Sequence, residues 1–147
     1  MRRTLMTLAL TAGLVGCGGE DKLSVEDYRT ELRRICADSD RQTEAVKEPT
    51  RATPDSIADY LRQLRDINAK TIERVEDLEP PDELEDAHDR ALEANREGRE
   101  KVDAVIDELQ GGGDPSQVLS EARQGLEESS NQAKQAARDI GVPECGD

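Results

Sequence analysis

The sequence predicts an all-α fold, namely an antiparallel up-down-up-down four-helix bundle with an extended C-terminal tail. Between residues 24 and 140, the less polar side chains recur at alternating intervals of three and four residues, the spacing of a helix with one packed face. Prolines and glycines divide this pattern into four segments with short connections, which favours a bundle. No strand-like alternation competes with it. A three-helix arrangement with one segment lying outside is the structural alternative.

The first two helices have clear start and stop signals. Ser24, with Asp27 three residues later, resembles a capping box, and Pro49 ends the first helix. The second begins at Thr53-Pro54-Asp55. Threonine is a favoured N-cap, proline is tolerated at the first helical position, and an acidic residue there interacts favourably with the helix dipole. Pro80-Pro81 stops this second helix.

The last two helices are bounded in the same way. The third is expected to start at Pro81 and to end before the three glycines at 111–113. Asp114 caps the fourth, with Gln117 at the reciprocal position of a capping box. Gly141 fits a left-handed C-terminal cap. The chain after it should run back nearly straight along the first helix.

The amino terminus has the pattern of an export signal. Arg2 and Arg3 precede an apolar stretch over residues 5–15, which is about half of the roughly 20 residues that cross a bilayer. We therefore interpret residues 1–16 as a signal peptide. The stretch ends in Leu-Val-Gly-Cys at 14–17, which resembles the lipobox of bacterial lipoproteins. That resemblance implies cleavage before Cys17 and a diacylglycerol on its thiol, with fatty acyl chains such as palmitate.

Two alternatives stay open for this leader. The cysteine can be incidental to an ordinary secretory signal. The arginine pair also resembles a twin-arginine signal, although the n-region is very short and the usual lysine is missing, so the general secretory route is preferred.

The lipobox divides the chain into a signal peptide (1–16), a lipidated tether (17–23) and a helical bundle domain (24–147). Two lipid chains anchor a protein durably. The six tether residues after Cys17 span roughly 20 Å when extended. We therefore expect a domain held close to the cell membrane, on its extracytoplasmic face.

Three further features of the mature chain are similar to those of small helical lipoproteins of actinobacteria. They are a first helix with Tyr28 and Cys36, a Leu-Glu-Pro-Pro turn at 78–81, and a Gly-Val-Pro-Glu-Cys-Gly ending at 141–146. The resemblance implies a helical fold and an envelope location. It implies no biochemical activity.

Composition narrows the classes of partner. Without its leader the chain has 18 basic and 34 acidic residues, a net charge of −16. Nucleic acid is excluded as an expected partner because its binding needs a basic surface, and anionic lipid headgroups would repel the domain. Tyr28 and Tyr60 are the only aromatic residues. The rings that commonly line sugar sites and ligand pockets are therefore scarce.

Cys36 and Cys145 remain after lipidation of Cys17. An even pair in an exported domain favours a disulfide, with two free thiols as the alternative. A zinc site is not expected, since the chain has one histidine and no Cys-x-x-Cys.

The candidate catalytic and cofactor motifs are incomplete. His88 ends a Glu-x-x-His motif, but a di-iron bundle needs two such motifs and the chain has a single histidine. We expect His88 at the edge of the bundle. Both methionines, Met1 and Met6, lie in the leader, which removes a common haem ligand. The sequence has no phosphate-binding or calcium loop. We therefore expect no enzyme activity, no cofactor and no metal.

Four polar residues interrupt the apolar faces near the middle of the four helices. In an antiparallel bundle, Ser39, Asn68, Asn95 and Ser129 fall at nearly one height and can form a polar layer across the core. Such layers usually fix helix register at some cost in stability. The alternative is a small hydrophilic pocket.

These observations lead to two functional hypotheses. The preferred one is a non-enzymatic, membrane-anchored module that binds another envelope component or has a structural role. The alternative is a solute- or ion-binding lipoprotein that uses the polar layer inside the bundle. A protein partner calls for an exposed apolar patch, whereas a solute calls for a cavity between the helices.

Overall fold

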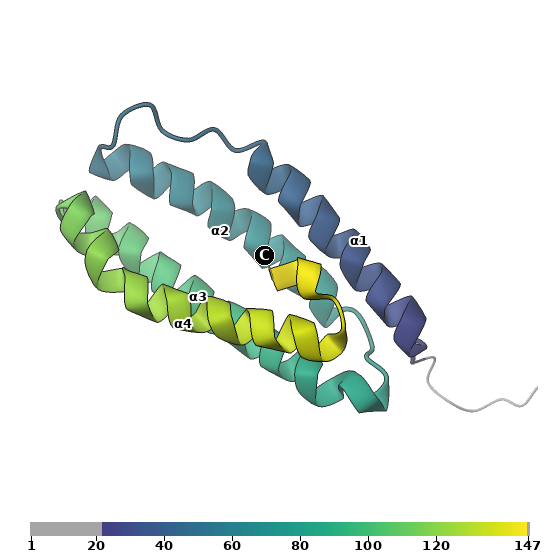
Figure 1. Cartoon of the computed structure of the whole chain (residues 1–147). Coiled ribbons are helices and arrows are strands. Elements are labelled where there is room, and N and C mark those ends of the chain that lie inside the picture. Colours follow the sequence, from purple (N-terminus) through teal and green to yellow (C-terminus); the bar gives the residue numbers. More distant parts are fainter. Residues whose placement is uncertain (1–21, 147) are drawn as a thin grey trace, which may run out of the picture.

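A computed structural model describes residues 22–146. The signal peptide, the lipobox and Cys17 lie outside these residues. Within them the chain is all-helical, which confirms the predicted fold class, and four long helices follow one another in alternating directions (Figure 1). They are α1 (Val25–Glu44), α2 (Pro54–Glu76), α3 (Glu85–Gln110) and α4 (Pro115–Ile140), with short 3-10 helices η1 (Asp82–Leu84) and η2 (Pro143–Gly146).

The predicted caps position these helices. The Ser24 hydroxyl accepts a hydrogen bond from the Asp27 backbone N–H, and Thr53 forms a capping box with Ser56. Asp114 caps α4, but the side chain of Gln117 donates to Glu121 instead of returning to the cap. Two helix limits expected from prolines differ slightly, since α1 ends at Glu44, before Pro49, and η1 separates Pro81 from α3.

The helices do not pack equally tightly. The most extensive packing is between α3 and α4, followed by α2 on α3, whereas α1 packs mainly on α2 and η2. The buried apolar residues accordingly form two clusters at opposite ends of the bundle. The first contains Tyr28, Leu32, Leu84, Ala87, Ala137, Ile140 and Val142. The second contains Ala58, Val105, Ile106, Leu109 and Val118, close to the α3–α4 turn.

The C-terminal segment corrects one detail of the predicted fold. Instead of an extended tail, residues 143–146 form η2. The expectation placed the end of α4 beside the start of α1, which would have required a long climb to Cys36. The Ile140 carbonyl instead accepts a hydrogen bond from Arg29, and the Gly141 carbonyl accepts one from Arg33. Arg33 is three residues before Cys36, about 4.5 Å along the helix, so a compact turn is long enough.

Gly141 makes this reversal possible. Its φ of 91° lies in the left-handed region, where a side chain is disfavoured, as the sequence predicted. Val142 follows it and is 1 % exposed, closing the end of the first cluster. Lys22 and Leu23 lie at this same end of the bundle. Lys22 forms a 2.5 Å ion pair with Asp82, and Leu23 packs on the cluster.

Candidate functional site

A cavity of about 460 Å³ lies between the two apolar clusters. We refer to it as the central cavity. Its walls come from all four helices and from η2. Along α3 they run from His88 to Val102, about 21 Å at helical rise. Small seam residues, such as Ala91, Gly98 and Ala133, line the cavity, and the chain has no Phe or Trp to fill it.

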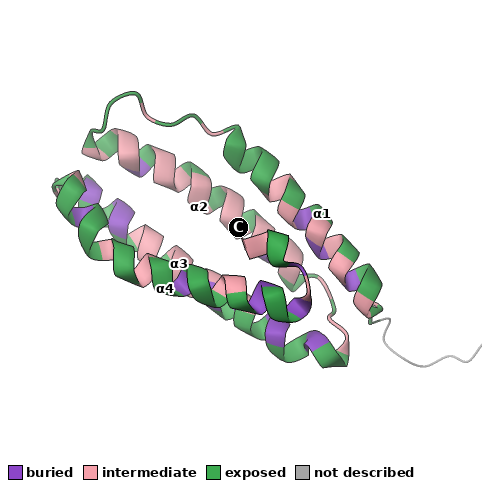
Figure 2. Ribbon diagram, in the orientation of Figure 1, coloured by how far each residue is buried: buried purple, intermediate pink, exposed green. Residues whose placement is uncertain are grey.

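Half-buried leucines mark the apolar part of the wall. Leu61 and Leu64 of α2 and Leu126 of α4 line the central cavity, and all three are only partly buried. Most of α2 is of this intermediate class, in contrast to the buried positions at the ends of α3 and α4 (Figure 2). Complete burial of such a side chain contributes roughly 1.5–3 kcal/mol. An apolar molecule in the cavity would therefore gain contacts that the protein leaves unused.

The four residues of the predicted polar layer lie on the wall of this one cavity. They are Ser39, Asn68, Asn95 and Ser129. The Asn68 amide donates to the Asn95 carbonyl oxygen across 3.4 Å, linking α2 to α3, and the Asn95 amide donates to the Ala91 backbone carbonyl at 2.8 Å. The layer is thus a polar band around a cavity, with oxygen and nitrogen atoms available to a ligand.

The two serines of the band connect neighbouring helices. Thr71 donates to the Ser39 hydroxyl at 3.0 Å, from α2 to α1. Ser129 is 2 % exposed, and its hydroxyl accepts a 2.5 Å hydrogen bond from Lys101 of α3. Each of these bonds fixes the height of one helix against the next, which is the register role expected of buried polar groups.

We expect that replacing both Asn68 and Asn95 with leucine preserves the free energy of unfolding or raises it, by about 1–2 kcal/mol. The two leucines remove a long hydrogen bond between half-buried amides and fill part of the central cavity. The same change should loosen the register and increase backbone amide exchange in α2 and α3. Thermal denaturation together with hydrogen exchange measures both effects. A loss of more than about 1 kcal/mol would mean that the amides stabilise the fold.

Two cationic residues of the wall were missed in the sequence. Arg65 of α2 and Arg99 of α3 line the central cavity beside the polar band. Each adjoins a seam position, and a charged residue beside a seam is usually interpreted as part of a solvated face. No spacing rule distinguishes such a residue from its exposed neighbours.

His88 closes one end of the cavity, which corrects the prediction of an edge position. It is 5 % exposed, and the Tyr28 hydroxyl lies 2.6 Å from its Nδ1 atom. Burial lowers the pKa of His88 despite the opposing charge of Asp89, while burial raises the pKa of Tyr28 to about 12. The neutral imidazole and the Tyr28 hydroxyl therefore share one hydrogen bond, whose direction depends on the tautomer of the imidazole. The pairing of the two residues across 60 positions depends on tertiary structure, so no sequence spacing indicates it.

The lowered pKa of His88 predicts a pH dependence of stability. In the unfolded chain the imidazole binds a proton near pH 6.5, whereas the folded protein resists protonation. The free energy of unfolding should thus fall as the pH drops below about 6.5. Asp38, Asp139 and Glu144 also have lowered pKa values, so their contributions are lost only in stronger acid. Denaturant unfolding between about pH 7 and pH 5 should separate wild type from His88→Gln. If the free energy of unfolding changed with pH in the same way in both proteins, His88 would not be the source of the pH dependence.

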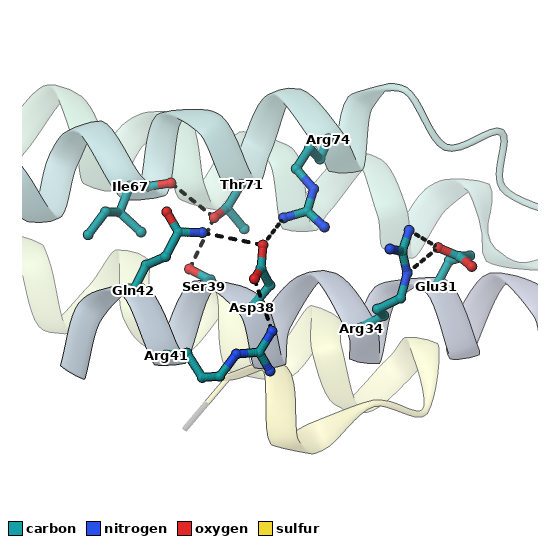
Figure 3. A network of polar contacts seen from close by, with 9 residues as sticks. All are labelled: Glu31, Arg34, Asp38, Ser39, Arg41, Gln42, Ile67, Thr71 and Arg74. Carbon is teal, nitrogen blue, oxygen red and sulfur yellow. Dashed lines mark hydrogen bonds and ion pairs between the residues drawn. The ribbon is translucent and has the colours of Figure 1, made fainter. Parts of the chain in front are cut away.

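A polar network fastens α1 along one side of α2 (Figure 3). Asp38 accepts hydrogen bonds from Arg74 of α2 at 2.6 Å and from Arg41 of its own helix at 3.0 Å. The Arg74 guanidinium, followed by Arg41, holds the pKa of Asp38 below its usual value. These contacts are at the surface, so their contribution to stability is small, but they orient Ser39 toward Thr71.

The predicted pair of cysteines meets on the other side of α1. Cys36 and Cys145 are joined by a disulfide with an S–S distance of 2.07 Å and a Cα–Cα distance of 5.4 Å. Both residues also line the central cavity. The disulfide thus holds α1 at the point where the C-terminal segment ends.

Comparisons with known proteins add no further information on this site. No family model, no curated protein and no solved structure matches the chain. Within residues 22–146, no group of three or more His, Cys, Asp or Glu side chains is arranged to hold a metal ion. In that same part of the chain, no helix has the length and apolar character needed to cross a membrane.

Proposed function

We propose that the mature protein is a non-enzymatic, lipid-anchored module of the cell envelope that binds a small, largely apolar molecule in the central cavity. The cavity itself carries this proposal. Its volume of about 460 Å³ falls within the range of roughly 300–1,000 Å³ typical of small-molecule sites. Mostly apolar walls with a few polar groups are also typical of such sites.

The surface favours a small molecule over a protein partner. Among the described residues, Leu119 is the only large hydrophobic side chain that is exposed, at 39 %. A single such residue does not form the contiguous apolar patch that marks most protein-binding sites. Of the two hypotheses from the sequence, the solute-binding alternative therefore has the stronger support.

The proposed anchor sets the position of the cavity relative to the membrane. Lys22 and Leu23 contact the bundle at the end that contains Tyr28. Lys22 is five positions after Cys17, a stretch that spans at most about 18 Å. A lipid on Cys17 would keep this end of the bundle near the membrane surface, within reach of apolar molecules that leave the bilayer.

Filling the cavity tests the proposal. Ala133 lies on the cavity wall, and Ala133→Phe would occupy space that the wild-type protein leaves empty. The neutral fluorophore N-phenylnaphthylamine, which gains intensity in apolar surroundings, serves as the probe. We expect saturable binding to the wild type and at least about tenfold weaker binding to Ala133→Phe, which is roughly 1.4 kcal/mol.

Gln124→Phe is the matched control, because Gln124 is exposed on the same helix and the substituted residue is identical. It should bind the probe as the wild type does. Equal binding by Ala133→Phe and wild type, or no binding by either, would contradict the proposed function.

A further inference from the structure

The charged residues of the central cavity differ from those of the rest of the protein. The whole chain has 34 acidic and 20 basic residues. The charged side chains that line the cavity are Asp40, Arg65 and Arg99. Asp40 is exposed on α1, while both arginines are partly buried. A strongly acidic protein thus has a cavity wall on which the positive charges outnumber the negative one.

The guanidinium groups of these arginines have unused hydrogen-bonding capacity. Among residues 22–146, Arg99 makes no salt bridge and no side-chain hydrogen bond. Arg65 approaches Asp103 at 3.3 Å through Nη1. Its buried Nε lies 3.0 Å from Asp66 but forms no hydrogen bond. A buried donor without an acceptor is costly, so an acceptor supplied by a ligand would be favourable there.

The two arginines lie at one height beside the polar band. The Asn68–Asn95 contact sets the antiparallel register of α2 and α3. Arg65 is three residues before Asn68, and Arg99 is four residues after Asn95, so both are about one helical turn from that contact on the same side. Asp66 and Asp103 both pair with Arg65, whereas Arg99 has no carboxylate partner among the described residues and can take a further anion. Its planar fork suits a carboxylate or a phosphate.

The apolar wall next to these arginines has room for a chain. On the side of the band toward Tyr28, the cavity continues along α3 to His88, and its lining residues Leu32 and Val142 are themselves buried. On the other side, Leu61, Leu64 and Leu126 are only partly buried. An alkyl chain that starts at the arginines would cover these leucines and would approach the second apolar cluster.

We propose that the ligand is a single-chain amphiphile with an anionic head, bound with its head on Arg99 and Arg65 and its tail against Leu61, Leu64 and Leu126. This inference rests on the proposed function and specifies the chemistry of the ligand. The head is a fatty carboxylate or a monoalkyl phosphate, which share a charged oxygen fork. Arg99 is the principal anchor, because Arg65 is already paired with Asp66 and Asp103.

Displacement of N-phenylnaphthylamine from the wild-type protein tests the head group. Four competitors have similar chains, namely palmitate, hexadecyl phosphate, hexadecanol and hexadecyltrimethylammonium, each used below its micelle-forming concentration. We expect the two anions to compete at least about tenfold more strongly than the alcohol, and the cation to be weakest. Whichever anion competes more strongly identifies the head group.

Arg99→Gln localises the effect. On this variant the two anions should compete no more strongly than hexadecanol does on the same variant. An unfolding midpoint equal to that of the wild type shows that the variant is folded. Arg123→Gln is the matched control, because Arg123 is exposed on α4 and pairs with Glu127 on its own helix. Asp40→Asn should strengthen anion binding by removing a negative charge from the wall.

Each remaining outcome overturns a defined part of the account. Equal competition by anions and hexadecanol, or stronger competition by the cation, refutes the anionic head but leaves the proposed function standing. Unchanged anion binding by Arg99→Gln refutes the placement of the head. Failure of the neutral probe to bind the wild-type protein refutes both proposals.

Discussion

Replacing Cys17 with serine is expected to release the protein from the membrane. The serine hydroxyl cannot form the thioether to diacylglycerol, and the described helices offer no membrane-spanning segment in its place. In a host that lipidates exported proteins, wild type should fractionate with membranes and incorporate radioactive fatty acid. Cys17→Ser should do neither, although it is still exported.

Cys36→Ser serves as the comparison for this experiment. Cys36 does not follow a lipobox, so its loss should leave fatty acid incorporation unchanged. If the Cys17→Ser variant remained in the membrane fraction and still incorporated radioactive fatty acid, the lipoprotein assignment would be contradicted.

Removing the disulfide is expected to have the largest effect on stability. Its two cysteines are 109 positions apart, and a link across so long a loop typically contributes about 2–4 kcal/mol. The contribution matters here because α1 packs mainly on α2 and η2, without the extensive contacts that join α3 to α4. The double variant Cys36→Ser/Cys145→Ser should lower the free energy of unfolding by that amount.

Denaturant unfolding of oxidised wild type, reduced wild type and the double variant measures this effect. The reduced wild type should behave as the double variant does. Release of α1 also opens the central cavity, so binding of the neutral probe should weaken in parallel. Identical unfolding midpoints for oxidised and reduced protein would show that the disulfide does not stabilise the fold.

The sequence was sufficient to predict the four helices because their limits depend on local chemistry. Ser24, Thr53 and Asp114 each satisfy backbone donors within three residues, and Gly141 adopts the positive φ that its position requires. The polar band was also predictable, because seam spacing alone places Asn68 and Asn95 inside an antiparallel bundle.

The central cavity could not be predicted because it depends on how far apart the helices lie. Small residues such as Ala91 and Ala133 can allow two helices to approach or can leave space between them, and the seam pattern is the same in both cases. The contacts that hold α1 beside the cavity include the Arg74–Asp38 hydrogen bond and the disulfide. These are contacts between residues distant in the sequence.

The arginines and the C-terminal segment were missed for related reasons. Arg65 and Arg99 have the same sequence surroundings as exposed arginines, and only the tertiary structure places them on a cavity wall. The shape of η2 depends on where α4 ends beside α1. That position is fixed by Arg29 and Arg33, whose hydrogen bonds to Ile140 and Gly141 span more than 100 residues.

Methyl NMR of the leucine side chains tests the central claim, ligand binding inside the bundle, most directly. With leucine methyl groups labelled and the protein titrated with the neutral apolar probe, the account predicts nuclear Overhauser contacts from the probe to Leu61, Leu64 and Leu126. The exposed Leu119 should show no such contact. Contacts restricted to Leu119, or a saturated complex without contacts to the three cavity leucines, would contradict the claim.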